Sequence, residues 1–417
     1  MYTIRMNRYI FFFFLSISSL PAANWLMLQG TQKQQGHHFW GFLQVKQEHN
    51  YGNIKDEGFN KTPFSYLKPE LKEQSDLILN RLRIGLRGGF DEENMINYFV
   101  LTEIAQNGVN NPLGYYNPTY LVDASLTLKY LPVYLRIGKF KYAGSEEGNM
   151  ARFASPFINF SSVGNQLMLE RFVGDDGIPT QGVGSYRDTG VQLFQTMNIS
   201  DNATLCLSYM LGNGSGTANS NQNDNHYTHY LYASVEKTLG TGKGYKKEAF
   251  KVYAWAQKGK RLYKDELFNR ERYGLGLTYF YNSLRIEAEY MAGQGMIVNG
   301  VKDSNPIKMQ EAWIYNMAPQ NDNKADGYYI LSSYGILDSL DILARYDVYN
   351  RLTNSDLAYR KFSSLTTGLS YRFKNYNRID VNYAFNSIDA PYMSQAQTLF
   401  DENVGDLLSI QLTLVIK

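Results

Sequence analysis

Short segments in which apolar and polar residues alternate recur along almost the whole chain, and this pattern limits the possible folds more than any other feature. Between Asn80 and Gly88, for example, leucine or isoleucine alternates with arginine. Because successive residues of a strand point to opposite faces, each such segment predicts a strand with one apolar and one polar face. The other segments are 39–46, 120–129, 203–211, 273–279, 284–290, 340–348, 365–373, 379–386 and 408–416.

Two all-β architectures produce this alternation, a soluble sandwich and a transmembrane barrel. Three features favour the barrel. The segments have about 9–11 residues, which is the length a tilted strand needs to cross a bilayer. Tyrosine and phenylalanine lie at segment ends, where a barrel has its aromatic girdles. Tight turns such as Asn282-Ser283 coexist with long polar connections such as 212–225 and 299–326, as at the two ends of a membrane barrel.

The composition agrees with this prediction. The 417 residues include 34 Tyr, 23 Phe and 35 Gly but a single cysteine, Cys206, so an internal disulfide is excluded. Mean hydropathy is −0.38, and apolar runs of roughly 20 residues, which a spanning helix needs, are missing. The formal net charge of +2 argues against a nucleic-acid partner. At about 24 residues per strand and connection, the chain has room for a transmembrane antiparallel β-barrel of roughly 16 strands.

The first 23 residues predict a secretory signal peptide. Basic residues precede an apolar stretch from Tyr9 to Leu20, and small residues follow up to Ala23. Pro21 is unfavourable for cleavage after Ala23, Met6 is an alternative start to Met1, and an uncleaved anchor is the alternative to a cleaved signal. We therefore expect export to the outer membrane, contact with its lipid, and a single barrel domain over residues 24–417.

One connection is much longer than the rest and has no usable periodicity. It runs from 144 to 186, between a basic strand at Tyr134–Lys141 and a strand beginning at Arg187. Connections of this length are normally functional or disordered. We predict that this loop folds into the lumen of the barrel and narrows it.

Basic residues gather around this loop and on an earlier strand. Charge acts more strongly in a narrow, partly desolvated constriction than in bulk water, so a basic track there could guide anions. The candidate pore-lining residues are Arg81, Arg83, Arg87, Arg136, Lys139, Lys141, Arg152 and Arg171. The alternative is a structural network in which lumen arginines pair with carboxylates. The expected counter-charges are Glu287, Glu289, Asp341, Asp347 and Asp380.

Other residue types give no sign of catalysis, so we expect no enzyme and no cofactor. The phenylalanines at 153, 157 and 160 are expected to pack the loop against the wall rather than contact solute. Zinc needs three or four converging ligands, and no metal site is expected from the five histidines, His37, His38, His49, His226 and His229. The sequence has no nucleophile elbow and no phosphate-binding glycine loop.

Several segments, in order along the chain, resemble the phosphate-selective porin O and P family of outer-membrane channels. They are Arg81-Leu82-Arg83-Ile84-Gly85 with Tyr98-Phe99, Leu135–Lys141, Arg187–Leu193, Gly327-Tyr328-Tyr329, Ala344–Asp347 and Arg378–Tyr383. The resemblance implies a 16-stranded barrel, usually a homotrimer, whose third long loop enters the lumen and whose basic wall residues guide anions.

The chain departs from the family pattern at the constriction, where Glu146 and Glu147 follow Lys139 and Lys141, and at its end, which lacks the usual terminal aromatic residue. The resemblance predicts a passive porin for small hydrophilic solutes, with a preference for anions such as phosphate. An outer-membrane hydrolase and a plugged binding or structural barrel without conductance are the alternatives.

Overall fold

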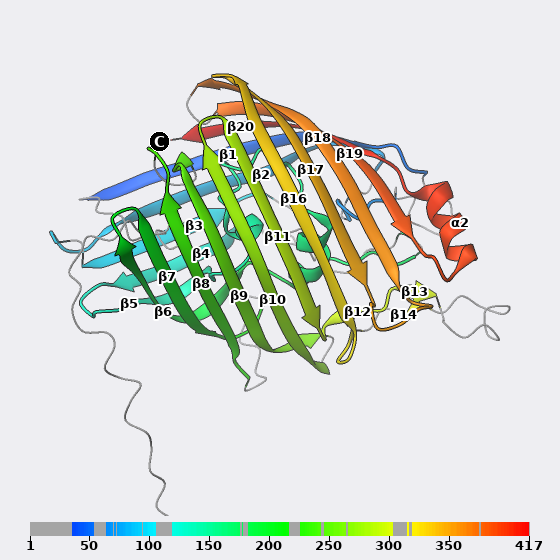
Figure 1. Cartoon of the computed structure of the whole chain (residues 1–417), viewed down its shortest axis with the longest axis horizontal. Coiled ribbons are helices and arrows are strands. Elements are labelled where there is room, and N and C mark those ends of the chain that lie inside the picture. Colours follow the sequence, from blue (N-terminus) through cyan, green and yellow to red (C-terminus); the bar gives the residue numbers. More distant parts are fainter. Residues whose placement is uncertain are drawn as a thin grey trace, which may run out of the picture.

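The computed structural model consists mainly of long antiparallel strands (Figure 1). It describes residues 36–53, 64–69, 71, 73–93, 95–105, 119–175, 177, 182–216, 226–242, 246–263, 266–302, 315–316, 319–374 and 377–416. The expected signal peptide, residues 1–23, lies outside the described residues. Within the described part of the chain, no helix is long and apolar enough to cross a bilayer.

Sixteen strands form one closed barrel, in which each strand pairs with its sequence neighbours and β1 pairs antiparallel with β20. The barrel strands are β1 His37–Asn50, β2 Ser75–Gly89, β3 Ile96–Glu103, β4 Tyr120–Leu128, β5 Tyr134–Lys141, β6 Arg187–Ser200, β7 Ala203–Gly212, β8 Thr228–Thr238, β9 Ala249–Tyr263, β10 Glu266–Tyr281, β11 Leu284–Gln294, β16 Lys324–Leu337, β17 Leu340–Arg351, β18 Arg360–Lys374, β19 Asn377–Asp389 and β20 Leu407–Ile416. The predicted fold class is therefore confirmed.

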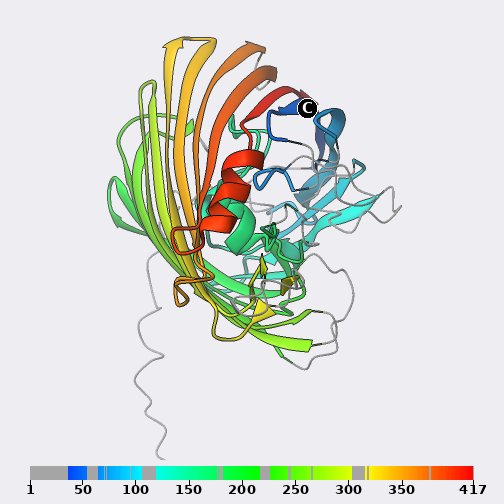
Figure 2. The ribbon, with the colours of Figure 1, turned by 90° about the vertical axis from the view of Figure 1, so that its right-hand side faces the viewer.

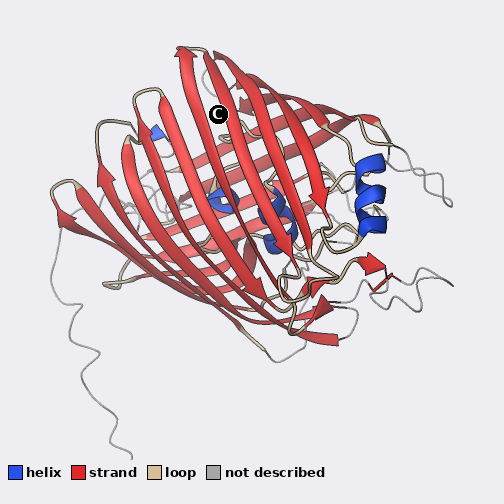
Figure 3. Ribbon diagram, turned by 45° about the vertical axis from the view of Figure 1, so that its right-hand side comes forward, coloured by secondary structure: helices blue, strands red, loops and turns tan. Residues whose placement is uncertain are grey.

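The remaining elements lie in the connections. They are α1 Glu146–Asn149, the π-helix η2 Gly164–Met168, α2 Ser394–Asn403, and the short strands β12 Ile297–Val298, β13 Val301–Lys302, β14 Tyr315–Asn316 and β15 Pro319–Gln320. Tight turns such as Asn282-Ser283 between β10 and β11 gather at one end of the barrel. Helix α2 lies at the other end (Figure 3). The end of β20 lies at the short-turn end (Figure 1).

The outer surface is apolar and the inner surface polar, as the alternation predicts. In β20, Ser409, Gln411 and Thr413 are buried inside the barrel, while Ile410 and Ile416 are exposed outside. Exposed aromatic side chains form two belts, separated by exposed leucine, isoleucine and valine. One belt contains Tyr281, Tyr334, Tyr371 and Phe373, and the other Tyr209, Tyr273, Tyr290, Tyr328 and Tyr346.

Part of the lumen is filled by an apolar core that several long connections build together. Phe64, Tyr66 and Leu67, from the connection between β1 and β2, pack with Leu167 of η2 and Ile297 of β12. The Asn165 side-chain amide donates to the carbonyls of Tyr66 (3.1 Å) and Leu67 (2.9 Å). The few apolar residues of this connection show no periodicity, so their burial could not be predicted from the sequence pattern. Figure 2 shows helical segments enclosed by the curve of the strands.

Candidate solute pathway

The 144–186 loop crosses the barrel and binds the opposite wall. At its start, the Ser145 hydroxyl donates to Glu289 of β11 (2.9 Å), and Glu146 forms an ion pair with Lys251 of β9 (2.6 Å). All four side chains are almost completely buried. The beginning of the loop is therefore attached to strands that lie far from β5 in the barrel order.

The middle of the loop is attached to β17 and β19. The Glu147 carboxylate accepts hydrogen bonds from the backbone and hydroxyl of Ser161 (2.8 and 2.6 Å) and lies 3.3 Å from Arg345. Burial raises the pKa of Glu147, and the Arg345 guanidinium offsets part of that rise. Nearby, the backbone N–H of Ser162 donates to Asp347 (2.7 Å) and that of Ile158 donates to Asn382 (2.8 Å).

Two carboxylates near the end of the loop are held by arginines of the wall. Glu170 forms ion pairs with Arg261 (2.9 Å), Arg270 (2.6 Å) and Arg272 (3.4 Å), and all four side chains are buried. We call these four residues the Glu170 clamp. Burial alone would raise the pKa of Glu170, but the three guanidinium groups outweigh it and the pKa is lowered. Asp175 is held in the same way by two arginines of β17 and β18, Arg351 (3.5 Å) and Arg360 (2.7 Å).

Three of the basic candidates meet at the wall formed by β1 and β2. The Gln44 side chain connects two of them, because it accepts a hydrogen bond from Arg81 (3.0 Å) and donates to the backbone carbonyl of Arg152 (3.2 Å). Arg83 lies two residues along β2 on the same face and pairs with Glu103 (2.7 Å). Arg187 of β6, which was not among the candidates, lies within electrostatic range of Arg83. We call Arg81, Arg83, Arg152 and Arg187 the basic cluster.

The basic cluster is only partly neutralised. Arg83 and Arg187 form ion pairs with Glu103 (2.7 Å) and Asp123 (3.0 Å). In the described part of the chain, Arg81 and Arg152 have no carboxylate within ion-pair distance. Arg152 instead donates to two loop carbonyls and lies 4.2 Å from the centre of the Phe160 ring. Burial lowers the pKa of Arg152 to about 10, which keeps it protonated at neutral pH.

The other candidates have different surroundings. Lys141 donates to the carbonyls of Gly148, Asn149 and Met150 (2.8–3.3 Å), so it holds the loop. Arg136 contacts Phe194 and the Thr127 hydroxyl. Lys139 lies partly buried near Arg187 and Asp123.

Arg171 and Arg87 also lie apart from the basic cluster. Arg171 donates to Asn165 within the loop (2.9 Å). Arg87 lies over the Trp40 ring, near the short-turn end of β2.

The expected counter-charges were wrong as partners of these candidates. Asp341, Asp347 and Asp380 pair with Arg372, Arg345 and Arg378, which come from their own or an adjacent strand. Glu287 and Glu289 accept hydrogen bonds from the Tyr329 hydroxyl (2.5 and 2.8 Å). The partners actually used, Glu103 and Asp123, lie on β3 and β4. Asp123 belongs to the polar face of an alternating segment, and this was the only sequence signal that could have identified it as an ion-pair partner.

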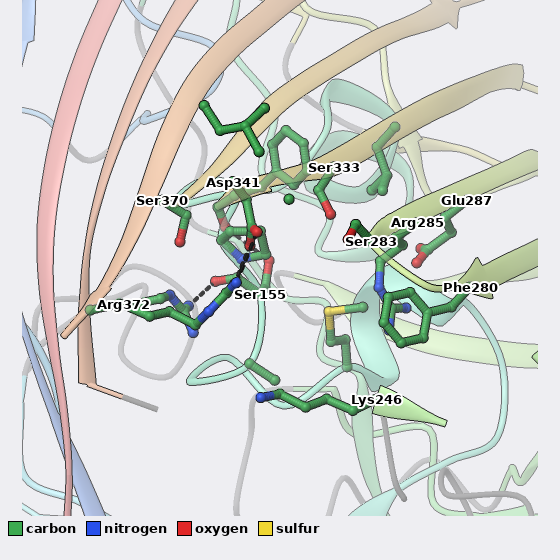
Figure 4. A pocket seen from close by; sticks show the side chains of 18 of the residues that line it. Ser155, Lys246, Phe280, Ser283, Arg285, Glu287, Ser333, Asp341, Ser370 and Arg372 are labelled. Atoms are coloured by element: carbon green, nitrogen blue, oxygen red, sulfur yellow. Dashed lines mark hydrogen bonds and ion pairs between the residues drawn. The ribbon is translucent and has the colours of Figure 1, made fainter. Parts of the chain in front are cut away.

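A cavity of about 450 Å³ lies at the short-turn end, beneath the loop (Figure 4). Arg372 and Asp341 line one side of it, Phe280 and Arg285 another, and Ser155 belongs to the loop above. Arg372 forms an ion pair with Asp341, so part of the charge that lines this cavity is neutralised. Among the described residues, no group of three or more His, Cys, Asp or Glu side chains is arranged to hold a metal ion.

A closed antiparallel barrel with an apolar belt between two aromatic girdles is the architecture of outer-membrane proteins. No protein-family model and no curated protein matches the sequence.

Solved structures, in contrast, match over most of the chain. OmpF of Salmonella typhi, in complex with daunomycin, has a TM-score of 0.56 and 14% identity, covering 91% of this chain and 97% of that one. An anion-selective porin from Comamonas acidovorans has a TM-score of 0.54 and 12% identity, covering 92% and 99%. OmpT of Vibrio cholerae in its trimer form has a TM-score of 0.54 and 11% identity, covering 91% and 99%. At these identities the likeness establishes the fold alone.

Proposed function

We propose that this protein is an outer-membrane porin, a passive diffusion channel for small hydrophilic solutes. The observation that carries the proposal is the 144–186 loop, which lies inside the barrel and is attached to the far wall at Glu146, Glu170 and Asp175. A loop fixed in this way narrows the lumen without depending on a partner. Solutes would then pass along the β1, β2 and β6 side, where the basic cluster lies.

The preferred solutes in this proposal are anions. A buried guanidinium without a carboxylate partner leaves positive charge in a space of low effective dielectric, where an anion is attracted more strongly than in bulk water. Among the residues that the structure describes, Arg81 and Arg152 are such groups, because no carboxylate lies within ion-pair distance of either. The glutamates that follow Lys139 and Lys141 in sequence do not reverse this balance, because Glu146 pairs with Lys251 and Glu147 with Arg345. The resemblance to the phosphate-selective family makes phosphate the first anion to test.

We also propose a homotrimer. Strands β3, β4 and β5 have 8, 9 and 8 residues, whereas β9, β10 and β18 have 15, 16 and 15. Eight residues at about 3.3 Å each, tilted by about 40°, rise only ~20 Å, which is less than the ~25 Å apolar band of such barrels. A wall this short is better matched to a neighbouring subunit than to lipid. OmpT of Vibrio cholerae was solved in a trimer form.

A planar-bilayer measurement under a KCl gradient tests the function. We expect ion conductance and a reversal potential that indicates chloride preference. The double substitution Arg81→Gln with Arg152→Gln should shift the reversal potential towards cation preference. Lys258→Gln, which removes the same kind of charge from a side chain that is 77% exposed, should leave it unchanged. A wild-type cation preference would overturn the anion proposal, and a lack of conductance would favour the plugged barrel.

A further inference from the structure

Three aromatic side chains form an apolar surface in a lumen whose walls are otherwise mostly polar. Trp40 and Phe42 of β1 lie 6.1 and 5.5 Å, between ring centres, from Phe153 of the 144–186 loop, and 6.3 Å from each other. Trp40 and Phe153 are partly exposed, whereas Phe42 is buried beneath them. We call these three residues the aromatic shelf.

The β1 sequence turns the shelf inward. Trp40 and Phe42 share a strand face with Gln44 and Lys46, which are buried inside the barrel. Gly85 on the adjacent β2 makes room for the indole, since a Cβ at that position would lie 2.7 Å from Trp40 Nε1. Phe99 of β3 supports the indole from behind, with 6.0 Å between ring centres. The shelf is therefore a packed part of the wall.

Arginines flank the shelf on the neighbouring strand. The guanidinium carbon of Arg83 lies 5.7 Å from the Phe42 ring centre, and that of Arg87 lies 6.0 Å from the Trp40 ring centre. The Arg87 side chain is partly exposed, and no hydrogen bond or ion pair joins it to the residues that the structure describes. Four residues along a strand separate the two arginines by about 13 Å. An anion at Arg87 therefore has an aromatic surface beside it and the basic cluster ahead of it.

We propose that Arg87, Trp40 and Phe153 form a subsite for organic anions that carry a planar apolar group, with benzoate as the simplest example. Its carboxylate pairs with the Arg87 guanidinium, and its ring packs on the exposed faces of Trp40 and Phe153. A small inorganic anion uses the charge but gains nothing from the rings. The inference deepens the porin proposal and rests on it, because it names the class of anion that this side of the lumen retains.

The test compares benzoate with acetate and inorganic phosphate in two measurements. In bilayers, benzoate should reduce the chloride current at a lower concentration than the other two anions. In detergent, benzoate should change the tryptophan fluorescence of the same protein at concentrations where acetate does not. Phe153→Ala should weaken both effects of benzoate by about 3- to 10-fold, the range expected for one aromatic contact. Trp40→Leu should weaken the block similarly.

Controls separate the subsite from general damage and from the pore itself. Phe385→Ala removes a ring that is 49% exposed on the lipid side, and should change nothing. Arg87→Gln should reduce the block of the chloride current by both anions, the stronger block by benzoate and the weaker block by acetate. Equal effects of benzoate and acetate, or an unchanged benzoate effect in Phe153→Ala, would overturn the subsite even if the KCl gradient shows an anion-selective pore. A barrel without conductance that still binds benzoate in detergent would keep the subsite and overturn the porin.

Discussion

The Glu170 clamp offers the sharpest test of whether the loop is fixed in the lumen. Glu170→Gln keeps the shape of the side chain but removes its charge, and so leaves three buried arginines, Arg261, Arg270 and Arg272, without their shared carboxylate. The backbone of Glu170 has a positive φ of 52°, and glutamine suffers the same strain there. The substitution therefore reports on the charge.

Removing one partner from a buried ion pair typically costs about 3–5 kcal/mol. The lower end applies here, because the arginines keep other acceptors. Arg270 donates to Gln257 (2.7 Å), Arg272 to the Leu167 carbonyl (3.0 Å) and Arg261 to the Val183 carbonyl (2.7 Å). About 3 kcal/mol corresponds to a roughly 100-fold change in the equilibrium between the seated and the displaced loop.

Limited trypsin digestion of the folded protein measures that equilibrium. Arg171 follows Glu170 and is 6% exposed, so cleavage there requires a displaced loop. When opening is fast, the cleavage rate follows the open population, and we expect it to rise by up to about 100-fold. Glu271→Gln breaks an exposed ion pair with Lys258, for which about 0–1 kcal/mol is typical, and should leave cleavage nearly unchanged. Equal cleavage of the two variants would refute a charge-based clamp.

Two further predictions concern the same loop. The pKa of Glu170 is lowered in the folded protein, so its stabilisation is complete above the ordinary carboxyl pKa and is lost as the pH falls through the lowered value. Loop opening, followed as current noise, should therefore increase in the wild type as the pH falls below about 4, the ordinary range of a glutamate pKa, but not in Glu170→Gln. Gly148→Ala would place a Cβ against the Tyr186 ring in a buried position. Overpacking of this kind costs about 1–3 kcal/mol, so tryptic cleavage at Arg171 should increase correspondingly. Gly335→Ala is the milder control, because the nearest atom to its new Cβ would lie 3.2 Å away.

The alternating pattern was sufficient to predict the barrel, because lipid on one face and a polar lumen on the other impose a period of two on every strand. In the segment 203–211, for instance, Thr204, Cys206 and Ser208 share the more polar face, and all three are buried on the inner side. The pattern failed in β4. There Leu121, rather than Val122, is exposed outside, at 44%, and Val122 packs with Phe99 and Leu101.

The cause in β4 is an irregularity in the pairing with β3. Leu101 pairs with Asp123 and Thr102 with Leu121, so Val122 is an extra residue in the ladder. Because of this one extra residue, the side chains that precede it in the strand face the opposite side of the barrel from the one that the alternation predicts. The position of such a bulge depends on the partner strand, which the local sequence does not encode. The same limit explains the wrong ion-pair partners, because Arg83 lies 20 residues from Glu103 and Arg187 lies 64 residues from Asp123.

The arginines on the two sides of the loop differ in their partners. On the β9, β10, β17 and β18 side, Arg270, Arg351 and Arg360 are bound to loop carboxylates and are buried. These arginines hold the loop and are not available to a solute. On the β1 and β2 side, Arg81 has no such carboxylate within ion-pair distance among the residues that the structure describes. Sequence alone makes the two sets of arginines look equivalent, and only the course of the loop shows which arginines hold it.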